Sequence, residues 1–551
     1  MRGLPPPRRV SHDVLNQAPP YEGLNLYEID VALREAVHRH GAGWAEARLH
    51  AWGATVGSAE HQQLAADANR FPPVLRTHDR SGNRIDQVDY HPSYHELMRR
   101  SVEQGLHTGP WADPCPGAHV ARAAGFFLAA QGDLGHGCPI SMTYSVVPSL
   151  RFEPSLAAAW EPRVTAMSYD PRFLPAGQKR GALFGMAMTE KQGGSDVRAN
   201  TTTAAPIDET IDGAPAYALT GHKWFCSAPM CDAFLVLARA PGGLTCFLVP
   251  RWLPDDTPNP LYIQRLKDKL GNRSNASSEI ELDHTLGLRV GEEGRGVRTI
   301  IEMSNHTRLD CVIGSAALAR LCLSVAMNHA RHRRAFGRAL VHQPLMENVL
   351  AELALESEVA TASTLRLAAT YDATDEASLL LKRLLTPLFK YWVCKRAPAV
   401  VGEAMECVGG AGYVEELPFA RAWREAPLLP IWEGSGNVIC LDVLRALHKA
   451  PDTLEVLFAE LDRASGVDQR LDRAVSALRE DLPGLLADEA RARVLVERIS
   501  RCVQGAILAQ SAPAAVTAAY CDARLDHGGS ATFGTLSRRV DLGALVERAM
   551  P

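Results

Sequence analysis

The pattern of apolar and polar residues divides the chain into four segments. From residue 28 to 180, apolar residues recur at spacings of three and four, as in IDVALREAVHRH (29–40) and YHELMRRSVEQ (94–104). This is the period of an amphipathic helix, so we expect a mostly helical segment. Proline and glycine clusters predict breaks between its helices at 71–73, 109–117 and 171–177.

The pattern changes near residue 181. Between 217 and 283 the chain contains short β-rich runs separated by Gly, Pro and Asp, namely YALTGHKWF, AFLVLAR, LTCFLVP and SSEIELD. Runs of this length and composition predict strands joined by turns. The strand-like segment ends at the glycine-rich GEEGRGV (291–297).

Helical periodicity then returns in three long stretches, 311–336, 345–371 and 379–408. Their lengths and short links predict a helix bundle. A fourth segment, 446–551, is rich in Ala, Leu and Arg. LPGLL (482–486) and the glycines at 528–529 predict that it breaks into several short helices.

Separate blocks of helix and strand predict an α+β protein of several domains. We expect an N-terminal helical domain at 1–180, a central β domain at 181–292, a helix bundle at 293–445 and an extra C-terminal helical domain at 446–551. The length of 551 residues agrees with roughly three or four domains. Strands and helices do not alternate, which argues against a Rossmann fold.

Composition narrows the class of protein. The apolar fraction of 46%, the charged fraction of 22% and the net charge of −5 are typical of a soluble protein without a whole-chain basic field for nucleic acid. The 12 cysteines form no C-x-x-C pair and the histidines no H-E-x-x-H pattern, so we expect no metal site and no disulfide framework. The N-terminus lacks a signal-peptide core, and the apolar runs are shorter than the roughly 20 residues of a membrane span. We therefore expect a cytoplasmic protein that does not enter a membrane.

The first candidate for chemistry is GMAMTEKQGGSDVRANTT (185–202), where the β segment opens. Gly193 and Gly194 permit close approach of the backbone to a ligand, and Thr189, Ser195 and nearby amides can bind phosphate or ring heteroatoms. The segment is neither G-x-G-x-x-G nor a P-loop. From its residues alone, an ordinary surface turn is the favoured interpretation of this segment.

Six segments in fixed order give this stretch a context. T-E-x-x-x-G-S-D at 189–196 resembles the flavin-binding signature of the acyl-CoA dehydrogenase family. The other five segments that are similar to motifs of this family are GHKWFCS (221–227), KLGNRSNASSEIEL (269–282), GEEGRGV (291–297), RRAFG (333–337) and the run from Glu406 through IWEGSGN to Asn437. Together they cover about 181–445. Details of these motifs, the N-terminal segment and the extension past 446 resemble the branch of the family linked to the bacterial response to DNA alkylation.

The resemblance implies FAD as the cofactor and an FAD-dependent oxidoreductase of the acyl-CoA dehydrogenase type. Phe225 and Cys226 stand where the family usually has Trp and Ile, and Ser227 where it has a hydroxyl against the flavin. The residues implied to bind FAD are Met186, Met188, Thr189, Gly194, Ser195, Phe225, Cys226, Ser227, Arg333, Gln343, Ile431, Trp432, Gly434, Ser435, Gly436 and Asn437.

Arg333 and Gln343 match family positions that reach the FAD of a neighbouring subunit, which implies a homotetramer. Without the motif, Arg333 would be a solvated helix charge.

Glu433 lies between Trp432 and Gly434 in the last of these segments. In many acyl-CoA dehydrogenases a glutamate at this position removes the α-proton of the thioester. Other members carry the base in an L-x-x-E-R segment, but here that segment reads NHTR and places Thr307 at the base position. We therefore expect Glu433 to be the base if there is one. A retained turn carboxylate without an efficient substrate is the alternative.

The alkylation-response branch is associated with duplex DNA through its C-terminal region. Residues 445–551 contain 13 Arg and one Lys against 15 Asp and Glu, a net charge of −1, which does not supply clustered positive charge by composition. A folded stripe can supply it, and we expect it to include Arg445, Lys449, Arg491, Arg498 and Arg501. Ordinary solvated helix faces are the alternative.

Two functional classes follow from the sequence. The first is a flavoprotein with weak acyl-CoA dehydrogenase activity that associates with duplex DNA and protects or repairs it against alkylation. The second is a true acyl-CoA dehydrogenase that oxidises a small acyl-CoA or another organic substrate, with Glu433 as base and no role on DNA.

Overall fold

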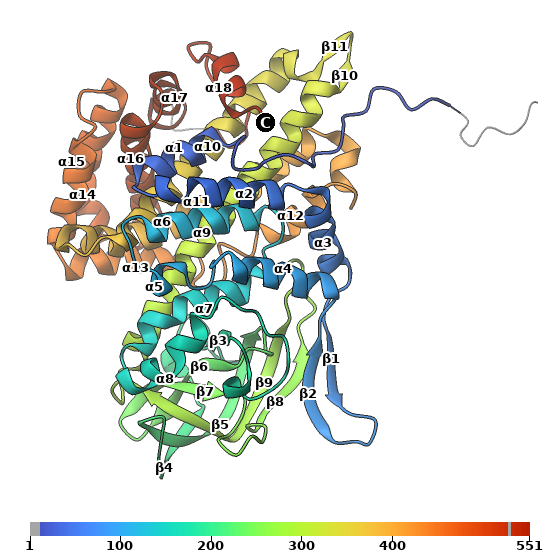
Figure 1. Ribbon diagram of the computed structural model, residues 1–551. Coiled ribbons are helices and arrows are strands. Elements are labelled where there is room, and N and C mark those ends of the chain that lie inside the picture. The colour runs from blue at the N-terminus through green and yellow to red at the C-terminus, as the bar shows by residue number, and fades with distance from the viewer. Residues whose placement is uncertain (1–11, 527–529) are drawn as a thin grey trace, which may run out of the picture.

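The computed structural model describes residues 12–526 and 530–551 and consists of a β barrel below a large helical body (Figure 1). The predicted glycine break at 528–529 and the start of the N-terminal segment lie outside these residues. The predicted α+β architecture is confirmed. Among the described residues, no group of three or more His, Cys, Asp or Glu could hold a metal ion.

The N-terminal part contains eight helices within the described residues: α1 (Val31–Arg39), α2 (Glu46–Val56), α3 (Ala59–Arg70), α4 (Pro92–Glu103), α5 (Gly109–Ala112), α6 (Ala118–Ala130), α7 (Gly137–Leu150) and α8 (Pro154–Val164). The mostly helical pattern did not predict a pair of strands at 74–89. Here β1 (Val74–His78) and β2 (Arg84–Asp89) form an antiparallel hairpin around an Asp79-centred turn. The backbone pairing runs from Val74 opposite Asp89 to His78 opposite Arg84, and Arg76 on β1 also forms an ion pair with Asp89 on β2.

The barrel is built from β3 (Phe184–Ala187), β4 (Thr203–Ile211), β5 (Ala214–Ser227), β6 (Ala233–Ala240), β7 (Gly243–Pro250), β8 (Leu261–Leu266) and β9 (Ser277–Val290). Pairings β5–β9, β9–β7, β7–β6, β6–β4 and β4–β5 close the sheet, β3 joins β6 in parallel, and β8 pairs with β9. The inward-facing residues and the apolar faces of α7 and α8 form one core. The strand ends at Ala187, Ser227 and Ser277 therefore lie beside α7.

The helical body is built around α9 (Gly296–His332), α10 (Pro344–Asp372) and α11 (Glu376–Glu406). A hairpin of β10 (Arg334–Ala335) and β11 (Arg338–Ala339) links α9 to α10, and α12 (Phe419–Glu425) and α13 (Gly436–Lys449) follow α11. One helix, α9, has the length and apolar composition of a membrane span, but its apolar window is entirely buried in the protein, as in the core helix of a bundle.

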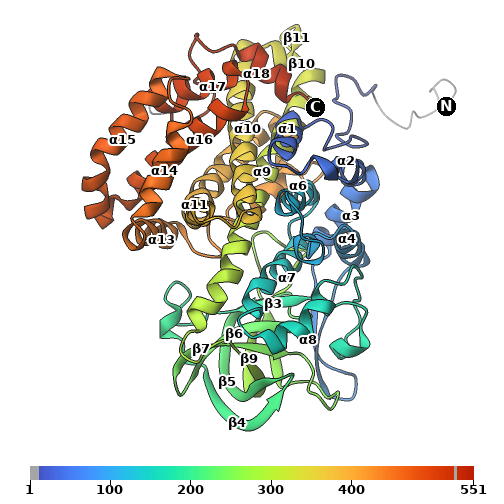
Figure 2. The same cartoon turned by 60° about the vertical axis from the view of Figure 1, so that its left-hand side comes forward.

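The C-terminal part packs on the outside of the bundle with α14 (Asp452–Asp462), α15 (Gln469–Ala487), α16 (Ala492–Ser511), α17 (Ala514–Tyr520), a π-helical turn (Cys521–Asp526) and α18 (Leu542–Ala549) (Figure 2). The predicted break at 482–486 was wrong, since α15 continues through Pro483. Leu482 and Leu485 are buried on either side of the proline, and their packing holds the helix together.

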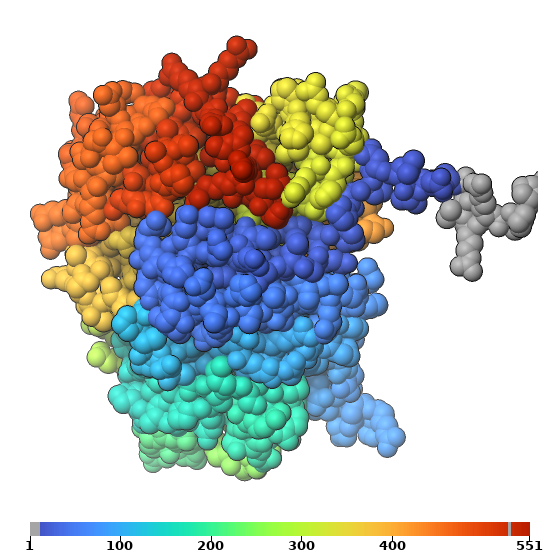
Figure 3. Space-filling view, turned by 45° about the horizontal axis from the view of Figure 1, so that its top comes forward, coloured from blue at the N-terminus to red at the C-terminus, as the bar shows by residue number. Residues whose placement is uncertain are grey.

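The N-terminal helix α1 contacts the C-terminal helices α16 and α18. In Figure 3 the blue N-terminal helices lie against the red C-terminal elements. Arg548 of α18 pairs with Glu35 of α1 at 2.6 Å, and Arg39 of α1 donates to the carbonyl of Ser511 at the end of α16 at 2.7 Å. These contacts fix the C-terminal helices to the rest of the body.

Candidate active site

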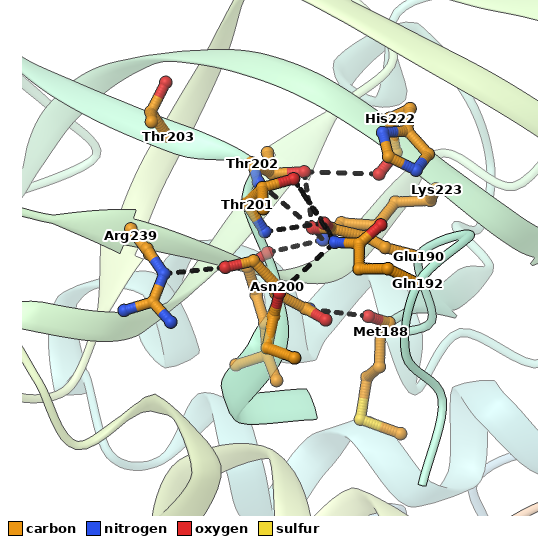
Figure 4. A network of polar contacts seen from close by, with 12 residues as sticks. Met188, Glu190, Gln192, Asn200, Thr201, Thr202, Thr203, His222, Lys223 and Arg239 are labelled. Carbon is orange, nitrogen blue, oxygen red and sulfur yellow. Dashed lines mark hydrogen bonds and ion pairs between the residues drawn. The ribbon is translucent and has the colours of Figure 1, made fainter. Parts of the chain in front are cut away.

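A buried carboxylate organises the loop that follows β3. Glu190 accepts hydrogen bonds from Lys223 Nζ at 2.6 Å, from Thr202 Oγ1 at 2.6 Å and from the Thr201 amide at 2.7 Å (Figure 4). Burial disfavours its charge, but the hydrogen bonds from Lys223, Thr201 and Thr202 prevail and lower the pKa of Glu190 to about 2. The loop is therefore anchored through an ion pair whose two side chains are fully buried.

The predicted glycines of this loop are needed sterically. A Cβ atom at Gly194 would lie 3.1 Å from Thr189 Cγ2, and one at Gly193 would lie 2.8 Å from the carbonyl oxygen of Asp196. Ser195 is exposed, Thr189 and Met188 are half-buried, and Met186 is buried in the strand. The loop thus presents backbone and small polar groups towards the outside of the barrel.

The aromatic segment lies at the end of β5. Phe225 is 48% exposed, and Lys267 Nζ lies 3.3 Å from the ring centroid of Trp224 and 4.7 Å from that of Phe225. Cys226 departs from the expectation of a cofactor contact, because strand alternation turns its side chain into the barrel, where burial raises its pKa to about 12. Only its backbone can contact a ligand on the outer side.

The turn that carries Glu433 is held by two cations. Glu433 has a φ of 62° and Gly434 a φ of 115°. Arg308 Nε donates to the carbonyl of Glu433 at 3.0 Å, and Lys390 Nζ donates to the carbonyl of Gly434 at 2.6 Å. Arg308 also pairs with Asp442 on α13 at 2.9 Å. A left-handed conformation at a glutamate costs roughly 1–2 kcal/mol, so these contacts stabilise a strained turn.

The Glu433 carboxyl is the most chemically distinct group in the site. Its Oε2 atom is buried and has no hydrogen-bond partner among the residues that the structure describes. Burial raises its pKa, whereas Arg308, Thr307 and Lys390 oppose the rise. Thr307 therefore lies close to Glu433. The structure thus brings together the two positions at which the family motifs carry a base, and of these only position 433 has a carboxylate.

Ser435, Gly436 and Asn437, which follow Glu433 at the N-terminus of α13, lie close to two cations. Ser435 caps α13 without a side-chain hydrogen bond, and a Cβ atom at Gly436 would lie 3.4 Å from Arg493 Nη2 and 3.6 Å from Lys395 Cε. Arg493 Nε also donates to Asn437 Oδ1 at 2.9 Å. Free amides at a helix N-terminus together with two cations fit a phosphate-bearing group.

Ile431 and Trp432 precede Glu433 in the chain. Ile431 is 61% exposed, and the indole Nε1 of Trp432 is buried without a hydrogen-bond partner in the described part of the chain. An unpaired buried donor is costly, so this atom fits an acceptor on a ligand.

Three residues near Glu433 were not singled out from the sequence. Lys269 donates to the carbonyl of Asn275 at 2.8 Å and to Ser277 Oγ at 3.1 Å, and burial lowers its pKa to about 8. The side-chain amide of Asn275 is buried with neither polar atom paired by a hydrogen bond in the described residues, and Cys138 lies within electrostatic reach of Lys269 and Glu433. The K-x-G-x-R segment at 269–273 was the available signal for Lys269.

Arg333 and Gln343 do not join this site within one chain. They flank the β10–β11 hairpin at the top of the helical body, far from the barrel (Figure 1). Arg333 donates to the carbonyl of Asn16 at 2.6 Å and Gln343 to that of Ala335 at 2.9 Å. Phe336 at the hairpin tip is 97% exposed.

The predicted DNA-binding residues fall into two groups. Arg445 and Lys449 are exposed on α13, and Arg491 is exposed before α16. Arg498 pairs with Asp481 at 2.7 Å and Arg501 with Glu497 at 2.6 Å, which compensates their charges. The predicted basic stripe is therefore interrupted at Arg498 and Arg501.

Sequence models of three domains match the chain. These are the adaptive response protein AidB N-terminal domain over residues 16–171, the acyl-CoA dehydrogenase middle domain over 185–285 and the acyl-CoA dehydrogenase C-terminal domain over 294–448.

Among curated proteins, the chain is 44% identical over 522 residues to the Escherichia coli (strain K12) protein named "Putative acyl-CoA dehydrogenase AidB", covering 94% of this chain and 95% of that protein. It is 29% identical to acyl-CoA dehydrogenase family member 11 of Caenorhabditis elegans, over 81% of this chain and 74% of that protein. The solved structure of Caenorhabditis elegans ACDH-11 in complex with C11-CoA superposes with a TM-score of 0.82 at 26% identity, covering 93% of this chain and 94% of that chain.

Proposed function

The chain belongs to the acyl-CoA dehydrogenase family of FAD-dependent oxidoreductases, and on that premise we propose that Glu433 is the base that removes the α-proton of an acyl-CoA thioester. The predictions of the family, the oxidoreductase class and FAD as cofactor are confirmed by this membership.

The observation that supports the base most strongly is the buried, unpartnered Oε2 of Glu433. A carboxylate without hydrogen-bond donors on that oxygen is more basic, and burial brings its pKa closer to neutral pH, where a general base is most effective. Arg308 and Lys390 hold the turn by its carbonyls and so leave the carboxyl oxygen available to a substrate.

FAD, when bound, accepts the hydride equivalent from the substrate. We propose that the backbone of 188–195 and Ser227 contact its ring system, that Trp432 Nε1 donates a hydrogen bond to it, and that the α13 N-terminus with Lys395 and Arg493 binds its phosphates. The unpaired Trp432 donor and the cationic neighbours of Gly436 support this assignment.

We propose that the enzyme is of the AidB type, with low turnover on ordinary acyl-CoAs. The extent of the similarity to the Escherichia coli AidB protein and the matching AidB N-terminal domain support this choice. The alternative, an efficient dehydrogenase, is supported by the likeness to ACDH-11, whose structure contains C11-CoA.

Anaerobic reduction of the bound FAD by acyl-CoAs of increasing chain length separates the two. Fast reduction by any of them overturns the low-turnover assignment, and failure to take up FAD overturns the site.

We also propose that the protein associates with duplex DNA and protects it against alkylation. The name of the AidB adaptive response domain and the exposed Arg445 and Lys449 support this function. A gel-shift titration on duplexes of unrelated sequence tests it, with non-specific binding expected because phosphate contacts read no sequence. Absence of binding at low salt contradicts the proposal.

Finally, we propose a homotetramer in which the β10–β11 hairpin reaches a neighbouring subunit. The R-x-x-F-G segment on this hairpin and the 97% exposure of Phe336 at its tip support an interface there. Sedimentation velocity measures the number of subunits in the assembly, and a monomeric protein contradicts the proposed tetramer.

A further inference from the structure

A second cavity, of about 250 Å³, lies where the N-terminal helices meet the barrel. Its walls come from the end of β2 and from α4, from the segment 169–173, and from the turn 228–231 that follows β5. Its size is close to the lower end of the range for small-molecule sites. Because Ala228 follows Ser227 and Pro139 follows Cys138, the cavity lies next to the candidate FAD site without including the Glu433 turn.

The lining is unusually aromatic. The rings of Tyr90 and Tyr94 stack with centroids 4.3 Å apart and an angle of 16° between their planes. His95 Nδ1 and the Tyr169 hydroxyl form a hydrogen bond of 2.7 Å, and their rings are also stacked. Phe173 completes the wall. Flat walls of this kind favour a planar ring, which can stack on them or meet their edges.

The charged residues of the cavity already have partners. Lys179 pairs with Asp232 at 2.6 Å, and Asp170 pairs with Arg172 at 2.6 Å. An additional charge placed here would lack a counter-ion, and burying an unpaired charge is strongly unfavourable. The cavity therefore selects for an uncharged ligand.

One polar group of the cavity is unsatisfied. The hydroxyl of Tyr90 is buried and has no hydrogen-bond partner among the residues that the structure describes. Burial raises the pKa of this hydroxyl, and Cys231 and Tyr169, which both line the cavity, raise it further. Leaving a buried hydroxyl without a hydrogen bond costs roughly 1–3 kcal/mol. A ligand atom that accepts a hydrogen bond from this hydroxyl is therefore favoured.

We propose that this cavity binds a small, uncharged, planar aromatic molecule that accepts one hydrogen bond from the hydroxyl of Tyr90. The ring is held between the aromatic walls, and the acceptor fixes its orientation. This site stands independently of the base assigned to Glu433, since it requires neither that residue nor an acyl-CoA.

The test compares two probes of the same shape on the full-length protein with excess FAD. Quinoline carries one ring nitrogen as acceptor and is uncharged at neutral pH, whereas naphthalene has no acceptor. Dissociation constants are measured by ligand-observed NMR titration. Quinoline is expected to bind about threefold to tenfold more tightly than naphthalene, which is the effect of one hydrogen bond. Tyr90→Phe removes only the hydroxyl and should abolish this difference.

Tyr262→Phe is the matched control, because Tyr262 lies on β8 outside the cavity lining and should leave both affinities unchanged. Met98→Trp adds bulk to the wall and should weaken both probes. The proposal is overturned if the wild-type protein binds neither probe, or if it binds both equally, as expected when water satisfies the hydroxyl. It is also overturned if Tyr90→Phe retains the preference for quinoline.

Discussion

Arg308 donates a hydrogen bond to the carbonyl of Glu433 at 3.0 Å and pairs through the same guanidinium with Asp442 at 2.9 Å. This side chain thus connects α9, the Glu433 turn and α13. It also lowers the pKa of Glu433, against the effect of burial. The same residue therefore controls both the position and the basicity of the carboxylate.

The first prediction concerns the base itself. Glu433→Gln should slow reduction of bound FAD by an acyl-CoA by about 10²–10⁴-fold, because a positioned general base contributes this factor. FAD should remain bound, since the substitution keeps the size of the side chain. Stopped-flow absorbance of the flavin gives the rate, and Glu416→Gln, at an exposed glutamate, is the control. Reduction at the wild-type rate would show that Glu433 is only a turn residue.

The second prediction concerns pH. Burial raises the pKa of Glu433, and only the deprotonated carboxylate accepts a proton, so the rate of FAD reduction should be lost as pH falls through this raised pKa. Arg308→Met removes the charge that lowers the pKa of Glu433 most and should move the midpoint of the profile to higher pH. The pH profile of the single-turnover rate measures both midpoints. An unchanged midpoint in the variant would contradict the role given to Arg308.

The third prediction concerns the buried pair of Glu190 and Lys223. Lys223→Met should destabilise the fold by about 3–5 kcal/mol, because it leaves a buried carboxylate without its cation. The double variant Glu190→Gln, Lys223→Met should recover part of this loss. Denaturant unfolding gives the free energies, and additive losses would rule out direct coupling.

The same pair should make the free energy of unfolding depend on pH in acid. The folded pKa of Glu190 is about 2, below its ordinary value of 4.5, so its contribution to stability is fully present above that ordinary value and is lost as pH falls towards 2. The Glu190→Gln variant should therefore show a flatter loss of stability over this range.

The fourth prediction concerns assembly. Arg333→Glu should dissociate the proposed tetramer and release FAD together, since both depend on the hairpin beside it. Sedimentation velocity and flavin absorbance provide the two readouts. Arg80→Glu, on the exposed β1–β2 turn, makes the same charge change and should affect neither. Loss of FAD from an intact tetramer would separate the two effects and contradict the prediction.

The fifth prediction concerns DNA. Arg445→Ala should weaken binding to all duplexes alike and reduce the slope of the salt dependence by about one. Arg498→Ala should have a smaller effect, because Asp481 already compensates that charge at 2.7 Å. Fluorescence anisotropy over a range of salt concentrations measures the slope. Equal effects of the two variants would place the DNA contacts elsewhere.

The sequence by itself determined the block order of helices, β domain and bundle, because hydrophobic period and turn chemistry are local properties. It also determined the family, through six motifs in order, and it identified Glu433 as the carboxylate at a family base position. It did not reveal the β1–β2 hairpin, whose strands depend on pairing with each other, or the continuity of α15 through Pro483, which depends on the packing of Leu482 and Leu485.

Only the tertiary structure decided which groups meet. Cys226 lies in a matching motif, yet the alternation of β5 turns its side chain into the barrel. Arg498 and Arg501 look like phosphate ligands in the sequence, yet carboxylates on neighbouring turns and helices neutralise them. Burial and pairing depend on residues distant in the chain, such as Arg308 and Glu433 or His95 and Tyr169. For this reason the basicity of Glu433 and the aromatic cavity follow from the fold, and not from any local pattern.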